Sequence, residues 1–389
     1  MILTHYSKFA CDHDPKAVIV YVISYMAKKK KSIRRPSRIP VQPFWQKIIV
    51  VYSTRTWLRR LTIGMLWLLL ISFSAPLWNP IIFPPISHPE MGVSFSQKRS
   101  TELGLDWRAN YSALLNDIPL RHLRLMSYWD LHEEERGKFN FADLDWQMDE
   151  AARHGITVSL AIGLRQPRWP ECHQPDWAYQ LSGNSWKQAL YAFMEVVVKR
   201  YEHHPALESW QLENEGVNDW FGTCDAPDIT RLNEEFDLVK SWSKRPVWMS
   251  LSDQHGLPVD PPMPDAYGFS VYRRLWSDKT WPYIGYTTYP TPIWYHRGRA
   301  ALIKLMTGRD SFIHELQLEP WGATDTKNLT IAEQDKTMSI QQIRDNLYFA
   351  RELGMSNIYT WGSEWWYWRK VNGDPSIWQT VREEFSALR

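Results

Sequence analysis

The sequence predicts an α/β protein built on a (β/α)8 (TIM) barrel, preceded by an N-terminal transmembrane helix. Eight short apolar runs rich in β-branched residues alternate with amphipathic stretches, and over roughly 300 residues this is the rhythm of such a barrel. A charge-free segment precedes the first run. A doubly wound open sheet is the alternative, but no glycine-rich phosphate loop follows the first run, which disfavours it.

The first segment, 1–60, is basic. It holds 13 of the 45 Lys and Arg residues and only two of the 43 Asp and Glu residues, so the remainder of the chain is acidic. We interpret it as a disordered cytoplasmic tail. A nucleic acid partner is not expected, because the rest of the chain is net negative and would repel the phosphate backbone.

The segment 61–78, "LTIGMLWLLLISFSAPLW", contains no charged residue. At about 1.5 Å per residue a helix here would span roughly the hydrocarbon core of a bilayer. The basic residues before it predict that the tail stays in the cytoplasm and that the rest of the chain is extracytoplasmic, as a single-pass membrane-anchored protein. The alternative is a cleaved signal peptide with a long basic start. A proline-rich linker, 79–90, then leads to the folded domain, 91–389.

Within that domain each barrel unit has a candidate strand. Helical stretches are clearest at 141–155, 184–204 and 339–354, where caps and C-terminal glycines accompany the periodicity. The fifth unit is the weakest, because "DQHGLPVDPPMPD" holds too much proline for a full helix. The expected strands are 92–96, 122–127, 156–162, 207–212, 246–251, 266–271, 311–316 and 357–362.

Function in such a barrel is expected at the carboxyl ends of the strands. Nearly every expected strand end combines an aromatic residue with a carboxylate, an arginine or an amide, which is typical of a carbohydrate cleft. Tyr128 and Trp129 follow the second strand and Trp169 follows the third. These three are either platforms for a sugar ring or ordinary core and rim aromatics.

Glu215 follows the fourth strand and Glu315 ends the seventh, so their carboxylates should face one another across the barrel mouth. Two opposed carboxylates can break a glycosidic bond, one as acid and one as nucleophile, when they lie about 5–5.5 Å apart. Asn214 would donate its amide to the sugar hydroxyl beside the reacting carbon. Glu213 is interpreted as structural, because strand alternation points it away from the side of Glu215.

These residues resemble those of a known family. "WQLENE" resembles the strand-four Asn-Glu signature of the retaining (β/α)8 glycoside hydrolases, and "FIHELQLEPWG" resembles their strand-seven nucleophile segment. "HLRLMSYWDLHEEERGKFNFADLDWQMDEAARHGI" resembles their second and third units. The resemblance covers about 91–385 and is nearest to the cellulase-like family 5, which is related to β-galactosidases and xylanases.

The resemblance implies that Glu215 is the acid/base and Glu315 the nucleophile. It also implies that Asn214 holds the substrate, that Arg124 and Tyr272 orient Glu315, and that Trp361 forms the floor of the cleavage subsite. Glu319, four residues after Glu315, is the alternative nucleophile. His314 either binds substrate or packs.

The sequence thus predicts a retaining glycosidase for β-linked oligo- or polysaccharides, with no cofactor and no metal site. Two alternatives are a catalytically inactive glycan-binding barrel and a transglycosylase with the same residues. Cys172 and Cys224 follow neighbouring strands, so they either form a disulfide beside the cleft or remain two buried thiols.

Overall fold

The computed structural model describes residues 56–82, 88–218, 221–251, 262–278 and 284–388. The chain divides into two compact units, Met1–Ser72 and Phe73–Arg389, which are described separately. Residues 1–55 of the predicted basic tail lie outside the described residues, and so do residues 83–87 of the predicted linker.

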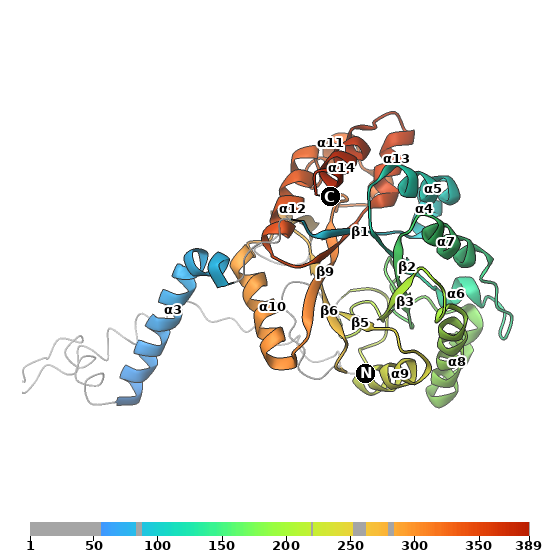
Figure 1. The fold of residues 1–389 in the computed structure, drawn as a ribbon, viewed down its shortest axis with the longest axis horizontal. Coiled ribbons are helices and arrows are strands. Elements are labelled where there is room, and N and C mark those ends of the chain that lie inside the picture. Colours follow the sequence, from blue (N-terminus) through green and yellow to red (C-terminus); the bar gives the residue numbers. More distant parts are fainter. Residues whose placement is uncertain (1–55, 83–87, 219–220, 252–261, 279–283, 389) are drawn as a thin grey trace, which may run out of the picture. The chain divides into compact units, whose positions relative to one another are not determined.

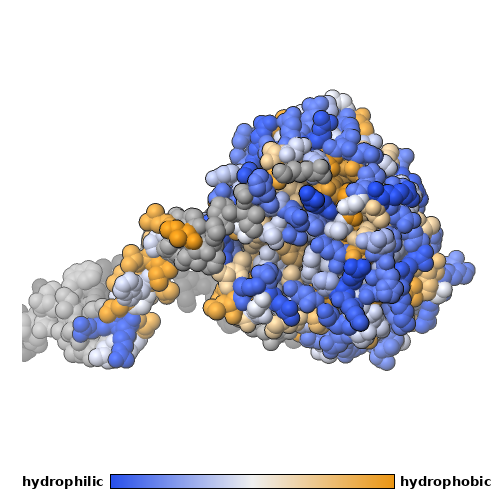
Figure 2. Space-filling model, viewed as in Figure 1, coloured by the Kyte–Doolittle hydropathy of each residue, from blue (hydrophilic) through white to orange (hydrophobic). Residues whose placement is uncertain are grey.

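The segment predicted to cross a membrane, 61–78, lies in helix α3, Thr56–Ile82. Its exposed side chains include Leu66 and Leu68, and Figure 2 shows orange, hydrophobic residues along it. Across the described ranges, however, no helix combines the length and the apolar character needed to cross a bilayer. The predicted transmembrane span is therefore not supported.

The second unit is a closed barrel of eight parallel strands (Figure 1). The strands follow one another around the barrel in chain order, and β1 pairs with β10 to close it. Every predicted strand overlaps an observed one, so the predicted (β/α)8 barrel is confirmed. The strands are β1 (Glu90–Ser94), β2 (His122–Met126), β3 (Thr157–Ile162), β4 (Leu207–Leu212), β5 (Val247–Leu251), β6 (Ala266–Val271), β9 (Asp310–Gln317) and β10 (Asn357–Trp361).

The helices lie outside the barrel, as the labels in Figure 1 show. The three best predicted stretches form α7, α8 and α12, and the side chain of Ser339 caps α12 by accepting a hydrogen bond from the amide of Gln342. The helices of the second unit are α4 (Gln97–Glu102), α5 (Trp107–Asp117), α6 (Trp129–His132), α7 (Ala142–Arg153), α8 (Gly183–Tyr201), α9 (Ile229–Trp242), α10 (Ile293–Thr307), α11 (Ile331–Gln334), α12 (Ile340–Glu352), α13 (Ser363–Val371) and α14 (Ser376–Ser386), with 3-10 turns η1 (Asp176–Gln180) and η2 (Thr326–Asn328).

The core lies between the strands and the surrounding helices. In β2, Leu123 and Leu125 are fully buried in this core, whereas Arg124 between them extends through the barrel interior to β4 and β9. This follows from strand alternation, which sends successive side chains to opposite faces. The alternation therefore places the charged group of Arg124 inside the barrel, while the leucines on either side of it pack in the core.

One element was not predicted. A two-stranded antiparallel hairpin, β7 (Arg274–Ser277) and β8 (Gly285–Thr288), follows β6. The amide of Trp276 donates to the carbonyl of Trp321 at 2.9 Å, so the hairpin is joined to the segment after β9. Most of the proline-rich fifth unit, 252–261, lies outside the described residues.

Candidate active site at the carboxyl ends of the strands

The residues predicted for catalysis come together at one end of the barrel. Asn214 and Glu215 follow β4 directly, Glu315 lies near the end of β9, and Arg124 lies on β2. All four are buried. Their meeting follows from the fold, because the carboxyl ends of parallel barrel strands surround the same opening.

Glu315 is held by two donors. Nη1 of Arg124 donates to Oε1 at 2.7 Å, and the hydroxyl of Tyr272 donates to Oε2 at 2.9 Å. Burial alone would raise the pKa of Glu315, but the charge of Arg124 lowers it to about 2. Glu315 is therefore an oriented, ionised carboxylate at ordinary pH.

Glu215 has different surroundings. The hydroxyl of Ser270 on β6 donates to Oε1 at 2.5 Å, and Nδ2 of Asn218 donates to Oε2 at 2.8 Å. One oxygen of Glu215, one oxygen of Glu315 and a ring nitrogen of His314 all lie within 4.8 Å of one another. This spacing is close to the roughly 5–5.5 Å that double displacement at a sugar carbon uses.

Glu213 has a structural arrangement instead. Its two carboxylate oxygens accept hydrogen bonds from the amides of Leu164 and Arg165, each at 2.7 Å, and Oε1 also accepts from Arg231 at 3.0 Å. A Cβ at Gly163 would come within 2.6 Å of Glu213, so the loop after β3 packs tightly on this carboxylate. Glu213 thus joins the ends of β3 and β4. Strand alternation does not set the direction of its side chain, because the backbone is left-handed at both Glu213 and Glu215, with φ of 52° and 48°.

Asn214 lies between a cation and a third carboxylate. Nη2 of Arg124 donates to Oδ1 of Asn214 at 2.6 Å, and Nδ2 of Asn214 donates to Oε2 of Glu171 at 2.8 Å. Nε of Arg124 donates to Oε1 of Gln211 at 2.5 Å. One arginine therefore orients both Glu315 and Asn214. Sequence reasoning missed Glu171, because no local pattern marks it within the long loop after β3.

Glu319, the alternative nucleophile, belongs to a neighbouring cluster. Nη1 of Arg168 donates to Oε1 of Glu319 at 2.5 Å, and Nη2 donates to Glu364 at 2.5 Å. The indole of Trp361 also donates to Glu319, at 2.7 Å, and the Arg168 guanidinium lies 3.9 Å from the centre of the Trp361 ring. This cluster fixes Trp361, the predicted floor of the subsite. Sequence reasoning assigned neither Arg168 nor Glu364.

The predicted aromatic residues have different environments. Trp169 is 59% exposed and packs edge-on against Phe221, with ring centres 5.9 Å apart. Tyr128 is buried, and its hydroxyl donates to the carbonyl of Pro167, so it supports the loop after β3.

The prediction that Trp129 offers a platform to a sugar ring is wrong. It is fully buried, and its indole donates to Glu133 at 2.7 Å. Its ring packs against those of Trp177 and Phe193. Trp129 is therefore a core residue with no surface to offer a sugar.

His314 is buried beside the two carboxylates, and Nε2 lies 3.5 Å from Oε1 of Glu315. Burial lowers the pKa of His314, which favours a neutral ring. Glu215, His314 and Glu315 are spaced closely enough to hold a metal ion. The Arg124 guanidinium already binds Glu315, however, and its positive charge disfavours a cation there.

Cys172 and Cys224 form a disulfide across 52 residues of chain. The amide of Thr223 donates to the carbonyl of Pro170 at 3.0 Å, and Nη2 of Arg165 donates to the carbonyl of Phe221 at 3.1 Å. The loops after β3 and β4 are therefore fastened together beside the carboxylates.

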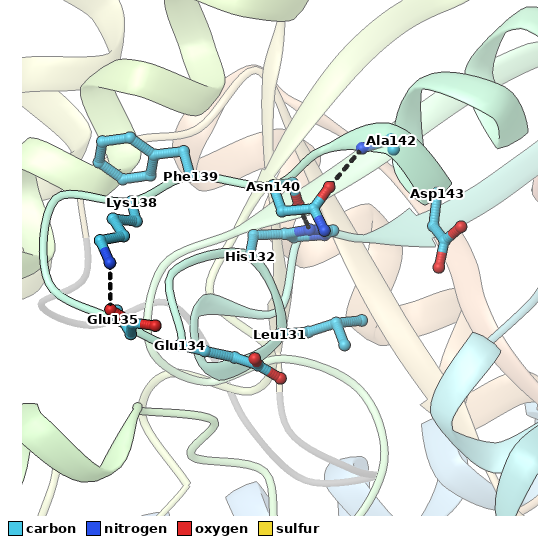
Figure 3. A pocket seen from close by; sticks show the side chains of 9 residues that line it. All are labelled: Leu131, His132, Glu134, Glu135, Lys138, Phe139, Asn140, Ala142 and Asp143. Atoms are coloured by element: carbon cyan, nitrogen blue, oxygen red, sulfur yellow. Dashed lines mark hydrogen bonds and ion pairs between the residues drawn. The ribbon is translucent and has the colours of Figure 1, made fainter.

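A separate surface hollow of about 320 Å³ lies over the segment between α6 and α7 (Figure 3). Glu135 and Lys138, which form an ion pair, line it together with Phe139 and Asp143. None of the predicted catalytic residues lines it, so it is distinct from the candidate active site.

The chain is similar in sequence to known beta-galactosidases. A family model described as beta-galactosidase, of glycoside hydrolase family 42, matches residues 112–237. Beta-galactosidase Bga of Halorubrum lacusprofundi is 27% identical over 194 residues, covering 41% of this chain. The chain spans about a quarter (26%) of that relative's length.

Solved structures share the fold. A variant of the GH5_18 enzyme of Bifidobacterium longum, in complex with Manβ1-4GlcNAc, matches with a TM-score of 0.51 and 13% identity, over 70% of this chain and 68% of the other. The β-galactosidase of H. lacusprofundi matches with a TM-score of 0.50 and 13% identity, over 77% and 58%. At this identity the matches bear on the fold alone.

Proposed function

Because the chain belongs to the clan of glycoside hydrolases built on (β/α)8 barrels, we propose that it is a retaining glycosidase for β-linked saccharides. Glu315 is the nucleophile and Glu215 the acid/base. The observation that carries this proposal is the approach of two buried carboxylates, with oxygens within 4.8 Å of one another, at the carboxyl end of the barrel. An inverting mechanism would need room for a water between carboxyl groups roughly 6.5–9.5 Å apart.

In the first step Glu315 attacks the anomeric carbon while Glu215 gives its proton to the leaving oxygen. The glycosidic C–O bond breaks as the ester bond to Glu315 forms. In the second step Glu215, now a carboxylate, takes a proton from water, and the water oxygen displaces Glu315 from the sugar.

Arg124 supports this division of roles. Its guanidinium keeps the pKa of Glu315 near 2, so that this group stays ionised and ready to attack. Glu319 is less suited to attack, because Arg168 and Trp361 already bind its Oε1 and it has neither Arg124 nor Tyr272 as a partner.

We propose β-galactosides as the first substrate class to test, since the family model over 112–237 and the curated relative both carry that activity in their descriptions. Transglycosylation is the second candidate. The exposed Trp169 ring, packed against Phe221, supports it as a platform for an acceptor sugar. An inactive glycan-binding barrel is disfavoured, because both carboxylates are present.

The folded domain is also proposed to be extracytoplasmic. The disulfide between Cys172 and Cys224 supports this, because disulfides persist mainly in oxidising compartments.

Turnover of 4-nitrophenyl β-D-galactoside, glucoside, mannoside and xyloside tests the proposed function. The galactoside should be cleaved fastest, and proton NMR should detect the β-anomer of the sugar first. Release of the α-anomer first would contradict a retaining mechanism. Added acceptor sugar separates hydrolysis from transfer, because only transfer forms a new disaccharide.

A further inference from the structure

Glu171 is a third buried carboxylate at the candidate active site, and it takes no part in the two proposed steps of cleavage. It lies in the loop after β3 and is 3% exposed. Its Oε2 accepts the hydrogen bond from Nδ2 of Asn214 at 2.8 Å. A buried carboxylate beside two others is unfavourable in electrostatic terms, so its presence calls for a function.

The orientation of the Asn214 amide follows from its two partners. Arginine can only donate hydrogen bonds, so the atom that faces Nη2 of Arg124 must be the amide oxygen. The amide nitrogen then faces Glu171, which accepts. Nδ2 carries two hydrogens, and Glu171 takes one of them. The other hydrogen can donate to a substrate hydroxyl.

The loop holds Glu171 firmly in this place. Its backbone has a φ of 74°, a left-handed conformation that a glutamate adopts rarely, and the amide of Glu171 donates to the carbonyl of Arg168 at 2.8 Å. A Cβ on Gly222 would come within 2.9 Å of the Glu171 side chain, so the loop after β4 packs directly against it. The disulfide at the next residue, Cys172, joins these two loops.

Protonation does not remove this contact. Burial raises the pKa of Glu171 well above its ordinary value, and the nearby charges of Glu215 and Glu315 raise it further, against the effect of the Asn214 hydrogen bond. A carboxyl group accepts a hydrogen bond through its carbonyl oxygen when protonated and through either oxygen when ionised. Glu171 can therefore hold the Asn214 amide in both states.

We propose that Glu171 is a positioning residue for glycoside cleavage, which fixes the Asn214 amide so that its second N–H meets the sugar hydroxyl beside the reacting carbon. The proposal rests on the proposed glycosidase function. It predicts that Glu171 matters only for substrates that carry this hydroxyl.

The test compares Glu171→Ala and Glu171→Gln on 4-nitrophenyl β-D-galactopyranoside and on its 2-deoxy analogue. The alanine variant should lose roughly a hundredfold in kcat/KM on the parent glycoside, since a misplaced contact at a reacting centre can cost that much. On the 2-deoxy glycoside the loss should be less than about threefold, because the hydroxyl that Asn214 serves is absent. The glutamine variant keeps a carbonyl acceptor and should restore most of the activity on the parent.

A matched control is Glu133→Gln, which changes another buried carboxylate, one that binds Trp129 and the amide of Gly137 outside the site. Its ratio of activities on the two glycosides should equal that of the wild type. Thermal melting of all variants, followed by circular dichroism, identifies any that are unfolded. Equal losses on both glycosides, or no loss on either, would overturn the role of Glu171. The proposed function would stand in either case, because it depends on wild-type turnover of the parent glycoside.

Discussion

Replacement of Arg124 by methionine gives the most informative perturbation of the site. Arg124 is buried and donates to Glu315, Asn214 and Gln211. Its charge is the principal influence that lowers the pKa of Glu315 from an ordinary 4.5 to about 2, against the effect of burial. Since one pKa unit corresponds to about 1.4 kcal/mol, the ionised form of Glu315 is favoured by roughly 3 kcal/mol relative to a carboxylate in water.

The expected result is a change in the pH dependence of kcat/KM. In the wild type Glu315 stays ionised as the pH falls, so activity that depends on its charge should be lost only near pH 2. In Arg124→Met, burial raises the pKa of Glu315 without an opposing charge. The fall of kcat/KM at acidic pH, the acidic limb of the profile, should therefore move above pH 4.5. Arg124→Lys keeps a charge but lacks the fork that reaches Asn214, so it should lower kcat with a smaller shift of the limb.

The assay is hydrolysis of 4-nitrophenyl β-D-galactoside in buffers from pH 3 to 9, a range in which Glu315 should give the wild type no acidic limb but should give Arg124→Met one. Arg153→Met, which removes an exposed arginine paired with Glu150, is the control and should leave the limb unchanged. The absence of an acidic limb above pH 3 in an active Arg124→Met variant would refute the reasoning, because the charge of Arg124 would then not control the ionisation of the nucleophile.

The remaining predictions concern the same loops and carboxylates. Glu315→Gln should abolish turnover yet still bind sugar, as isothermal titration with galactose can measure; near-normal rates would point to Glu319. Glu215→Ala should regain activity with azide on substrates that have good leaving groups, and a complete lack of rescue would argue against its acid/base role. Replacement of Cys172 and Cys224 by serine should lower the free energy of unfolding by about 4 kcal/mol in the chain-entropy model, measured by denaturant titration against the oxidised wild type; an unchanged midpoint would mean that the bond contributes nothing. Glu213→Ala should destabilise the fold by about 3 kcal/mol or more, because Arg231 and two buried amides lose their acceptor, and a loss below about 1 kcal/mol would contradict its structural role.

Much of the barrel could be predicted because its signals are local. The run 207–212 combines large apolar residues with polar ones and ends directly before Glu213, and 266–271 is largely apolar. The observed β4 and β6 have those same bounds. The positions of Glu215 and Glu315 then followed from the topology, since strand ends in a closed barrel share one opening.

The rest depended on contacts between distant segments. Glu171 meets Asn214 across 43 residues, and nothing in its own loop distinguishes it from a solvated glutamate. Trp129 was predicted to contact substrate because it follows a strand end, but the short helix α6 turns it into the core beside Trp177. The β7–β8 hairpin was missed because the strands are only four residues each.

The most direct test of the opposed carboxylates is trapping with 2,4-dinitrophenyl 2-deoxy-2-fluoro-β-D-galactopyranoside, followed by peptide mass spectrometry. The fluorine slows both steps, because it destabilises their positively charged transition states, and the good leaving group keeps the first step faster than the second. A glycosyl ester should therefore accumulate on the peptide that contains Glu315. A label on Glu319, or steady turnover of ordinary glycosides with no label at all, would contradict double displacement at Glu315.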